Sequence, residues 1–226
     1  MIKIAIAGSH GKMGKRIIDL AEKDKEFKIV SRFDAGHPAE PEISKCDCLI
    51  EFTAPQATVE HVRIAARLKK GVVIGTTGLS KEENDVIQKA SKNIPIVMSP
   101  NMSIGINLLF KLCQDAAHAL SKEYKVSMRE VHHVHKKDSP SGTAKRLADL
   151  VASERKIPAT EIPIEAIREG EVVGDHQVTF ESTDETIELF HRAKSRDTFA
   201  AGALKAAKFL AGKKSGLYNM RDVLGI

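Results

Sequence analysis

Short apolar runs alternate with helical segments over the first hundred residues, and this alternation constrains the fold more than any other feature of the chain. Five runs are predicted to be strands: 2–7, 27–33, 48–52, 72–74 and 94–98. Three segments between them have helical patterns: 13–23, 56–69 and 80–92. Apolar strands that alternate with helices are typical of a parallel sheet covered on both faces. We therefore expect an α/β, Rossmann-like domain here.

Two helix boundaries carry specific sequence features. Gly71 follows the helical segment 56–69 and is expected to terminate that helix, because glycine adopts the left-handed conformation without strain. Ser80 and Glu83 have the spacing of a capping box, which predicts the start of the helix at 80–92.

The pattern changes after Asn101. A helix is predicted at 104–121 and a strand at 125–131, followed by a short helix that opens at 141–143. Three strand-like runs then follow one another without helices between them: 162–168, 172–180 and 185–191. A helix at 198–210 and a short tail complete the chain. Successive strands of this kind predict a second, smaller α+β domain with an antiparallel or mixed sheet.

Composition narrows the choice of ligand. The net charge is +5 and the pI about 9.0, which fits either nucleic acid or anionic small molecules. The chain has no Trp and only two Tyr, so base-stacking side chains are scarce, and its Lys and Arg residues are scattered. We therefore expect an anionic small-molecule ligand and no nucleic acid.

Neither a membrane anchor nor a secretion signal is expected. No apolar run approaches the roughly 20 residues that span a membrane. The apolar stretch at 2–7 is too short for a signal peptide. The cysteines, Cys46, Cys48 and Cys113, are odd in number and lack the spacing of a disulfide framework or a zinc site. This pattern fits a reducing compartment, and we expect a cytoplasmic protein.

A glycine-rich loop, GSHGKMG at 8–14, lies between the first predicted strand and the first helix. Glycine permits a tight turn and a close approach of the backbone to a pyrophosphate, and the following helix directs N–H groups at the phosphates. The spacing is G-x-x-G-x-x-G rather than G-x-G-x-x-G, so an ordinary glycine turn remains an alternative. The candidate cofactor residues of this loop are Gly8, Ser9, His10, Gly11, Lys12 and Met13.

Asp34 supports a dinucleotide site. It lies 20 residues after Gly14 at the end of the second predicted strand, where a carboxylate accepts hydrogen bonds from the adenosine ribose. An aspartate in this place is also a common turn former. Arg32 and Lys12 are near enough to meet a 2′-phosphate. The expected cofactor is therefore NADH or NADPH.

Three further loops follow the C-termini of predicted strands, which is the edge at which open α/β sheets bind ligands. Their small and hydroxyl-bearing residues suit a nicotinamide ribose and carboxamide, although ordinary βα turns have a similar composition. The candidate cofactor residues in these loops are Phe52, Thr53, Gly75, Thr76, Thr77, Ser99, Pro100, Asn101 and Met102.

The segment EVHHVHKKDSPSGT at 130–143 concentrates three histidines and two lysines within six residues. The helix that opens after it offers N–H groups to an anion, and the His and Lys side chains add positive charge and transferable protons. This combination predicts a site for a carboxylated substrate that undergoes proton transfer. The alternatives are a solvated basic loop and a metal site formed by His133, His135 and Asp138, as in a metal-dependent hydrolase.

The chain resembles the dihydrodipicolinate reductase (4-hydroxy-tetrahydrodipicolinate reductase) family along nearly its whole length. The matching motifs are GSHGKMG at 8–14, EFTAP at 51–55, GTTG at 75–78, SPNMSIGIN at 99–107, EVHHVHKKDSPSGTA at 130–144, GDH at 174–176, HRAKSRDTFAAGALKAAKFL at 191–210 and SGLYNMRDVL at 215–224. The motif at 130–144 is highly specific to this family, whereas the glycine loop alone is not.

The resemblance implies an oxidoreductase that transfers hydride from NAD(P)H to a cyclic dicarboxylate, 4-hydroxy-tetrahydrodipicolinate, with loss of water, in the diaminopimelate route to lysine. It implies a homotetramer whose subunit has a dinucleotide-binding domain at 1–103 and 197–226. A domain for substrate binding and tetramerisation covers 104–196.

The resemblance also assigns roles to residues. It implies that His132 and Lys136 donate the proton. We further expect that domain closure brings the substrate to the nicotinamide, and that no metal takes part, because the charge of Lys136 and Lys137 opposes a cation. His133 matches a substrate-binding histidine. The matches to a cradle for a substrate carboxylate are Ser141, Gly142 and Thr143.

Three departures from the family pattern accompany the resemblance. Val134 stands where many members carry Arg, and Glu51 stands where Asp is usual. The chain is also shorter than many members, and we expect a shortened connection at 36–45. A non-catalytic NAD(P)-binding regulator or redox sensor is the alternative function, since it needs the glycine loop but no proton-donating loop.

Overall fold

The computed structural model describes all 226 residues, and the chain divides into two compact units. The first unit combines Met1–Ile104 with Arg196–Gly225, and the second consists of Gly105–Ser195 and Ile226. None of the helices combines the length and the apolarity that a membrane crossing requires.

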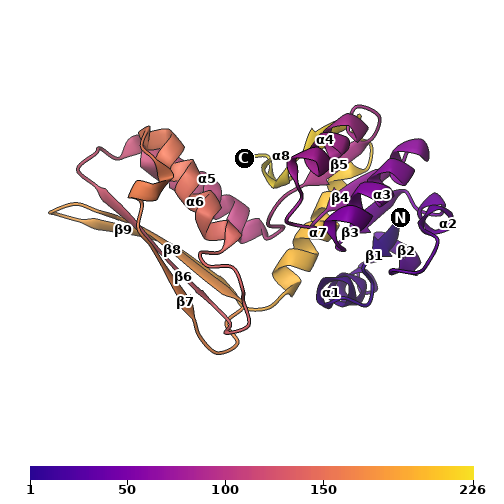
Figure 1. Cartoon of the computed structure of the whole chain (residues 1–226), viewed down its shortest axis with the longest axis horizontal. Helices are drawn as coiled ribbons and strands as arrows, with labels where there is room; N and C mark the ends of the chain where they lie inside the picture. The colour runs from indigo at the N-terminus through magenta and orange to yellow at the C-terminus, as the bar shows by residue number, and fades with distance from the viewer. The chain divides into compact units, whose positions relative to one another are not determined.

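A six-stranded, entirely parallel sheet forms the centre of the first unit (Figure 1). Its strands, in the spatial order β10-β5-β4-β3-β1-β2, are Gly216–Tyr218, Pro95–Met98, Gly71–Ile74, Cys48–Glu51, Ile2–Ala7 and Phe27–Phe33. The strand order changes direction between β1 and β3, the place at which sheets of this kind bind ligands. The predicted Rossmann-like parallel fold is confirmed.

Helices cover both faces of this sheet and produce two separate cores. The bounds are Lys12–Ala21 for α1, Ala39–Ser44 for α2, Pro55–Arg67 for α3, Lys81–Ala90 for α4, Asp197–Leu210 for α7 and Met220–Leu224 for α8. Alternate residues of β1 explain the two cores: Ile4 and Ile6 pack with α1, α7 and α8, whereas Ala5 and Ala7 pack with α2, α3 and α4.

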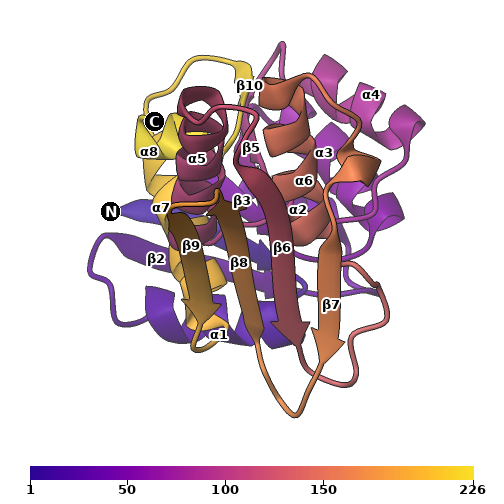
Figure 2. The ribbon, with the colours of Figure 1, turned by 90° about the vertical axis from the view of Figure 1, so that its left-hand side faces the viewer.

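The second unit contains a mixed four-stranded sheet with two helices on one face (Figure 1). In the order β7-β6-β8-β9, its strands are Ile164–Arg168, Lys125–His132, Gly174–Glu181 and Thr186–Ala193. The helices are α5 at Ile104–Ala119 and α6 at Gly142–Arg155, followed by the 3-10 turn η1 at Ala159–Glu161. Figure 2 shows the four strands side by side. The predicted second α+β region with a mixed sheet is confirmed.

The two helix boundaries behave differently. The capping box is confirmed, because Ser80 Oγ accepts from Glu83 N and the Glu83 carboxylate accepts from Ser80 N at 2.7 Å. The role assigned to Gly71 is wrong. Helix α3 ends at Arg67, Lys69 adopts the left-handed conformation with φ 57°, and Gly71 is the first residue of β4. The left-handed residue after α3 is therefore Lys69, so the turn ends before Gly71 is reached.

Three segments are more regular than the sequence indicates. The connection at 36–45 contains α2, which buries Ala39 and Ile43 against the sheet. The helix expected to be short, α6, has 14 residues. The tail adds β10 to the edge of the sheet and continues into α8, which begins with a capping box from Asn219. Each segment is too short or too weakly periodic for its apolar pattern to be recognised alone.

Candidate active site

The glycine loop forms a tight cradle at the C-terminal end of β1. Gly8 has φ +79°, and a Cβ atom on it would lie 2.3 Å from the carbonyl oxygen of Phe52. A Cβ on Gly14 would lie 2.1 Å from the carbonyl oxygen of Gly8. No side chain caps the N-terminus of α1, whose N-cap is Gly11. The loop thus leaves a helix N-terminus open to an anion, and these features fit the pyrophosphate of NAD(P)H.

Asp34 follows β2 and is tied to the glycine loop. Its carboxylate accepts a hydrogen bond from Ser9 Oγ, and the N–H of His10 is shared between the two carboxylate oxygens at 3.2 Å each. His10 Nδ1 also lies 3.2 Å from Oδ2. The side chain is 23% exposed, so a ribose hydroxyl can reach it. Lys12 is exposed, while the guanidinium of Arg32 pairs with Glu22. The glycine loop therefore fixes the orientation of the Asp34 carboxylate.

A buried polar network joins the loops after β3 and β4. Thr76 Oγ1 accepts from Thr53 N at 3.1 Å and from Thr58 Oγ1 at 2.9 Å. The carboxylate of Glu51, which is fully buried, accepts from Thr53 Oγ1 and lies 2.6 Å from Nδ1 of His61. The sequence did not single out His61 or the role of Glu51, because the two residues are 10 positions apart and meet only through the packing of α3 against β3.

Close packing also fixes these loops. A Cβ on Gly75 would lie 2.2 Å from the ring of Phe52, so glycine lets the two loops meet. After β5, Ser99 Oγ donates to the carbonyl of Asn101 at 2.8 Å, and Asn101 Oδ1 accepts from Ser103 N at 2.9 Å. Met102 is buried, whereas Pro100 and Thr77 are exposed. All four loops share one edge of the sheet because their strands are parallel.

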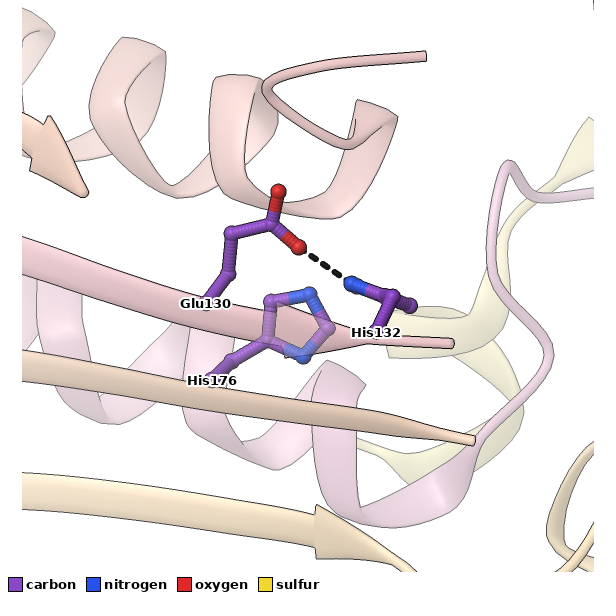
Figure 3. A group of neighbouring side chains, drawn as sticks. All are labelled: Glu130, His132 and His176. Carbon is purple, nitrogen blue, oxygen red and sulfur yellow. Dashed lines mark hydrogen bonds and ion pairs between the residues drawn. The ribbon is translucent and has the colours of Figure 1, made fainter. Parts of the chain in front are cut away.

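In the second unit, the end of β6 carries a buried carboxylate–histidine pair (Figure 3). One oxygen of Glu130 binds Nδ1 of His132. The other accepts from Ser141 N at 3.1 Å and from both terminal nitrogens of Arg168 at 3.0 Å. Burial lowers the pKa of His132, with Lys136 and Arg168 contributing, and this outweighs the opposite effect of Glu130.

His176 on β8 lies beside this pair. Its ring meets that of His132 edge to face at 5.1 Å and 78°, and its Nε2 lies 3.3 Å from Ser141 Oγ. Burial is the largest cause that lowers the pKa of His176 to about 3, with smaller contributions from His132, His191 and Lys136. His176 is therefore neutral at physiological pH and packs as part of the wall of the site.

The predicted carboxylate cradle lies at the N-terminus of α6. Ser141 Oγ accepts from Ala144 N and caps the helix, so this hydroxyl is already engaged. Gly142 is exposed, and a Cβ on it would meet nothing within 4 Å. Thr143 is half-buried. The open part of the cradle is thus the backbone of the first helical turn rather than the serine hydroxyl.

The carboxylate of Asp138 lies at the N-terminus of α6. Its Oδ1 lies 2.8 Å from Nζ of Lys136. Burial alone would raise the pKa of Asp138, but the hydrogen bond and charge of Lys136, with the backbone N–H groups of Asp138 and Gly142, lower it. Lys136 and the start of α6 therefore bind a carboxylate group together.

The remaining loop histidines lie apart from the His132 pair. His133 N donates to the carbonyl of Val172 at 2.7 Å, and its buried Nδ1 has no hydrogen-bond partner. His135 is exposed and lies 3.6 Å from Glu171. The alternative metal site with His133 and His135 lacks its third ligand, because Asp138 pairs with Lys136.

A different group of potential metal ligands lies close together: the ligand atoms of Glu130, His132 and His176 are all within 4.8 Å of one another (Figure 3). The carboxylate, however, already binds His132 and the guanidinium of Arg168. A cation would have to displace one of these groups beside the charge of the other, so the donor set fits hydrogen bonding better than metal binding. The sequence reasoning missed Glu130, Arg168 and His176 as a group, although the GDH motif contains His176, which pairs in register with Glu130.

Comparisons with known proteins agree along the whole chain. Two family models match: "Dihydrodipicolinate reductase, N-terminus" over residues 2–102 and "Dihydrodipicolinate reductase, C-terminus" over residues 105–224. A protein of Aquifex aeolicus named 4-hydroxy-tetrahydrodipicolinate reductase is 40% identical over 263 residues, covering 100% of this chain and 99% of the relative. One of the same name from Syntrophus aciditrophicus is 39% identical over 265 residues, with the same coverage.

Solved structures show the same fold. A dipicolinate-bound dihydrodipicolinate reductase from Paenisporosarcina sp. TG-14 has a TM-score of 0.83 at 23% identity and 97% coverage of both chains. A probable dehydrogenase from Thermotoga maritima has a TM-score of 0.68 at 9% identity, with 98% of this chain and 92% of the other covered. The fold is thus shared with dehydrogenases whose sequences have diverged widely.

Proposed function

The chain belongs to the dihydrodipicolinate reductase family, and we infer from this membership that it is an NAD(P)H-dependent 4-hydroxy-tetrahydrodipicolinate reductase of the diaminopimelate route to lysine. The reaction adds a hydride and a proton to the substrate, releases water and gives tetrahydrodipicolinate. The observation that carries this function at the site is the carboxylate of Asp138 held by Lys136 and the start of α6, beside the buried His132.

The cofactor supplies the hydride when it is bound. We propose that Gly8, Gly11 and the N-terminus of α1 hold its pyrophosphate and that Asp34 accepts from its ribose. The loops with Thr53, Thr76 and Asn101 would line its nicotinamide end. This proposal is supported by the missing Cβ atoms of the cradle and by the oriented carboxylate of Asp34.

For cofactor preference, we propose that both NADH and NADPH are used. Asp34 favours the free ribose hydroxyls of NADH, while the exposed Lys12 can approach a 2′-phosphate. Arg32 is also exposed, although it pairs with Glu22.

In the second unit, we propose that the N-terminus of α6 and Lys136 bind one substrate carboxylate in place of Asp138. His133, whose buried Nδ1 has no hydrogen-bond partner within the chain, would contribute to substrate binding. Lys136 and His132 are the groups that hold and transfer the proton, and the chemistry requires the substrate to meet the nicotinamide. A non-catalytic regulator would have no use for this arrangement.

We propose that the protein is a cytoplasmic homotetramer. One face of the second sheet carries no helix and exposes Phe190, which is 53% accessible and stacks with Arg192 (Figure 1). A second copy of the chain would cover this face. The three cysteines are buried and free, which fits a reducing compartment.

Oxidation of NADH or NADPH, followed by absorbance with freshly generated 4-hydroxy-tetrahydrodipicolinate, tests the function. We expect oxidation that depends on both the substrate and the enzyme. A reaction without substrate is the control for background oxidation. Absence of substrate-dependent oxidation with both cofactors would contradict the proposed function.

A further inference from the structure

We propose that Glu130 is a positioning residue, which fixes the orientation and tautomer of His132 and, at the same time, the start of α6. The inference rests on the proposed function, in which His132 takes part in proton transfer and α6 receives a carboxylate. It adds Glu130 to the residues of the proposed site, as one that acts through His132 and α6 and need not touch the substrate.

The two carboxylate oxygens of Glu130 bind different groups. Oε2 accepts from His132 Nδ1 (Figure 3). Oε1 accepts from Ser141 N at 3.1 Å and from Arg168 at 3.0 Å. The side chain is only 1% exposed. A buried carboxylate is costly unless it is paired and hydrogen-bonded, and Arg168 supplies the pairing.

The hydrogen bond between Glu130 and His132 determines which ring nitrogen of His132 is free to exchange a proton with the substrate. Because Glu130 accepts at Nδ1, that atom carries the proton of the neutral ring, and Nε2 is left for exchange with a substrate. A Cβ on Gly174 would lie 3.0 Å from Nε2, so glycine at this position avoids crowding the nitrogen. The edge-to-face contact with His176 restrains the ring from the side.

The same carboxylate sets the position of the anion cradle. Ser141 N is one of the N–H groups that an α-helix leaves without an internal partner. Glu130 binds it directly, and the serine hydroxyl caps Ala144 N. The imidazole of His132 and the first turn of α6 are therefore connected through one side chain.

The test compares E130Q with the wild type. Gln has nearly the same shape, but it lacks the charge and the second acceptor oxygen. We expect kcat to fall by ~10²-fold or more, since misplacing a general acid–base group removes a contribution of about 10²–10⁴-fold. The dissociation constant of NADH, measured by fluorescence, should stay within about twofold, because Glu130 lies in the other unit.

A spectroscopic measurement separates positioning from a merely structural role. Long-range proton–nitrogen NMR of the His132 ring should show the Nδ1-protonated tautomer in the wild type and a mixture in E130Q. The matched control is E154Q, which removes another carboxylate that faces a histidine, His118, in the same unit. E154Q should leave both kcat and the His132 spectrum unchanged.

The outcomes are distinguishable. If the wild type does not turn over the substrate, the proposed function fails. If the wild type is active and folded E130Q retains either wild-type kcat or the wild-type His132 tautomer, the positioning role is overturned. Should E130Q not fold, E130D replaces it under the same two criteria, since its shorter side chain keeps the charge but cannot reach His132 and Ser141 together.

Discussion

At the scale of single residues, Lys136 and His132 occupy different environments. Lys136 is partly accessible and pairs with Asp138, whereas His132 is buried and held by Glu130. The sequence placed both residues in one loop but did not reveal the carboxylate that each one contacts. Both carboxylates lie two positions away along the chain, whereas Arg168 and His176 reach the site from other strands and could not be found from the local sequence.

Replacing Lys136 with Ala should lower kcat by about 10²–10⁴-fold, because a proton donor and a carboxylate ligand are both lost. Steady-state oxidation of NADH measures the effect. K137A is the matched control, since Lys137 is an exposed lysine of the same loop. An unchanged kcat in K136A would exclude a catalytic role for Lys136.

Replacing Asp34 with Ala should weaken the binding of NADH more than the binding of NADPH, because a ribose hydroxyl of NADH loses its charged acceptor. A hydrogen bond to a charged group contributes about 1.5–3 kcal/mol, which corresponds to roughly tenfold or more in affinity. Fluorescence titration with each cofactor measures this, and D34N shows how much depends on charge alone. Equal binding of both cofactors by D34A and the wild type would show that Asp34 is not the ribose acceptor.

At the scale of elements, apolar periodicity predicted most strands and helices, because these elements bury whole faces. The strands β1 to β5 and the helices α1, α3, α4 and α7 lie close to their expected positions. The elements missed, α2, β10 and α8, have three to six residues each and depend on tertiary packing. The prediction that Gly71 ends a helix was wrong for a similar reason. The local preference of glycine for turns did not reveal that β4 begins at Gly71.

Replacing Ser80 with Ala should lower the free energy of unfolding by about 0.5–2 kcal/mol, because α4 loses the side-chain oxygen that binds Glu83 N. Urea denaturation followed by circular dichroism measures the change. S153A is the control: Ser153 is an exposed residue inside α6, where alanine is at least as favourable. A similar effect in both variants would contradict the capping role.

At the scale of the whole molecule, three histidines with a lowered pKa, His132, His176 and His191, all belong to the second unit. Burial is the largest cause in each. A histidine that stays neutral when folded becomes protonated on unfolding at pH values below its ordinary pKa. Acid therefore favours the unfolded state of this unit, from about pH 6.5 downward.

We expect the free energy of unfolding of the second unit to fall by up to about 1.4 kcal/mol per pH unit for each such histidine. For His176, with a pKa of about 3, the loss should continue to about pH 3. Urea titrations at a series of pH values measure this slope. H176Q should reduce the slope and H118Q should not, because His118 is exposed; equal slopes in all three proteins would contradict the prediction.

Replacing Phe190 with Glu should dissociate the proposed tetramer, because a carboxylate would replace the aromatic ring and be buried at the proposed contact. Sedimentation velocity measures the size of the assembly. F190Y keeps the ring and should retain the wild-type size. A tetramer of undiminished stability in F190E would show that this face of the sheet is not the contact.

The first unit is built from two separated stretches of chain, and this has a consequence for the order of folding during synthesis. Helix α7 supplies much of the core on one face of the parallel sheet, including Ala203, Leu204 and Leu210. The ribosome makes α7 only after the whole of Gly105–Ser195. Apart from Ile226, the second unit is continuous and can fold as it emerges, whereas one face of the parallel sheet, although made first, is covered only by α1 until α7 arrives.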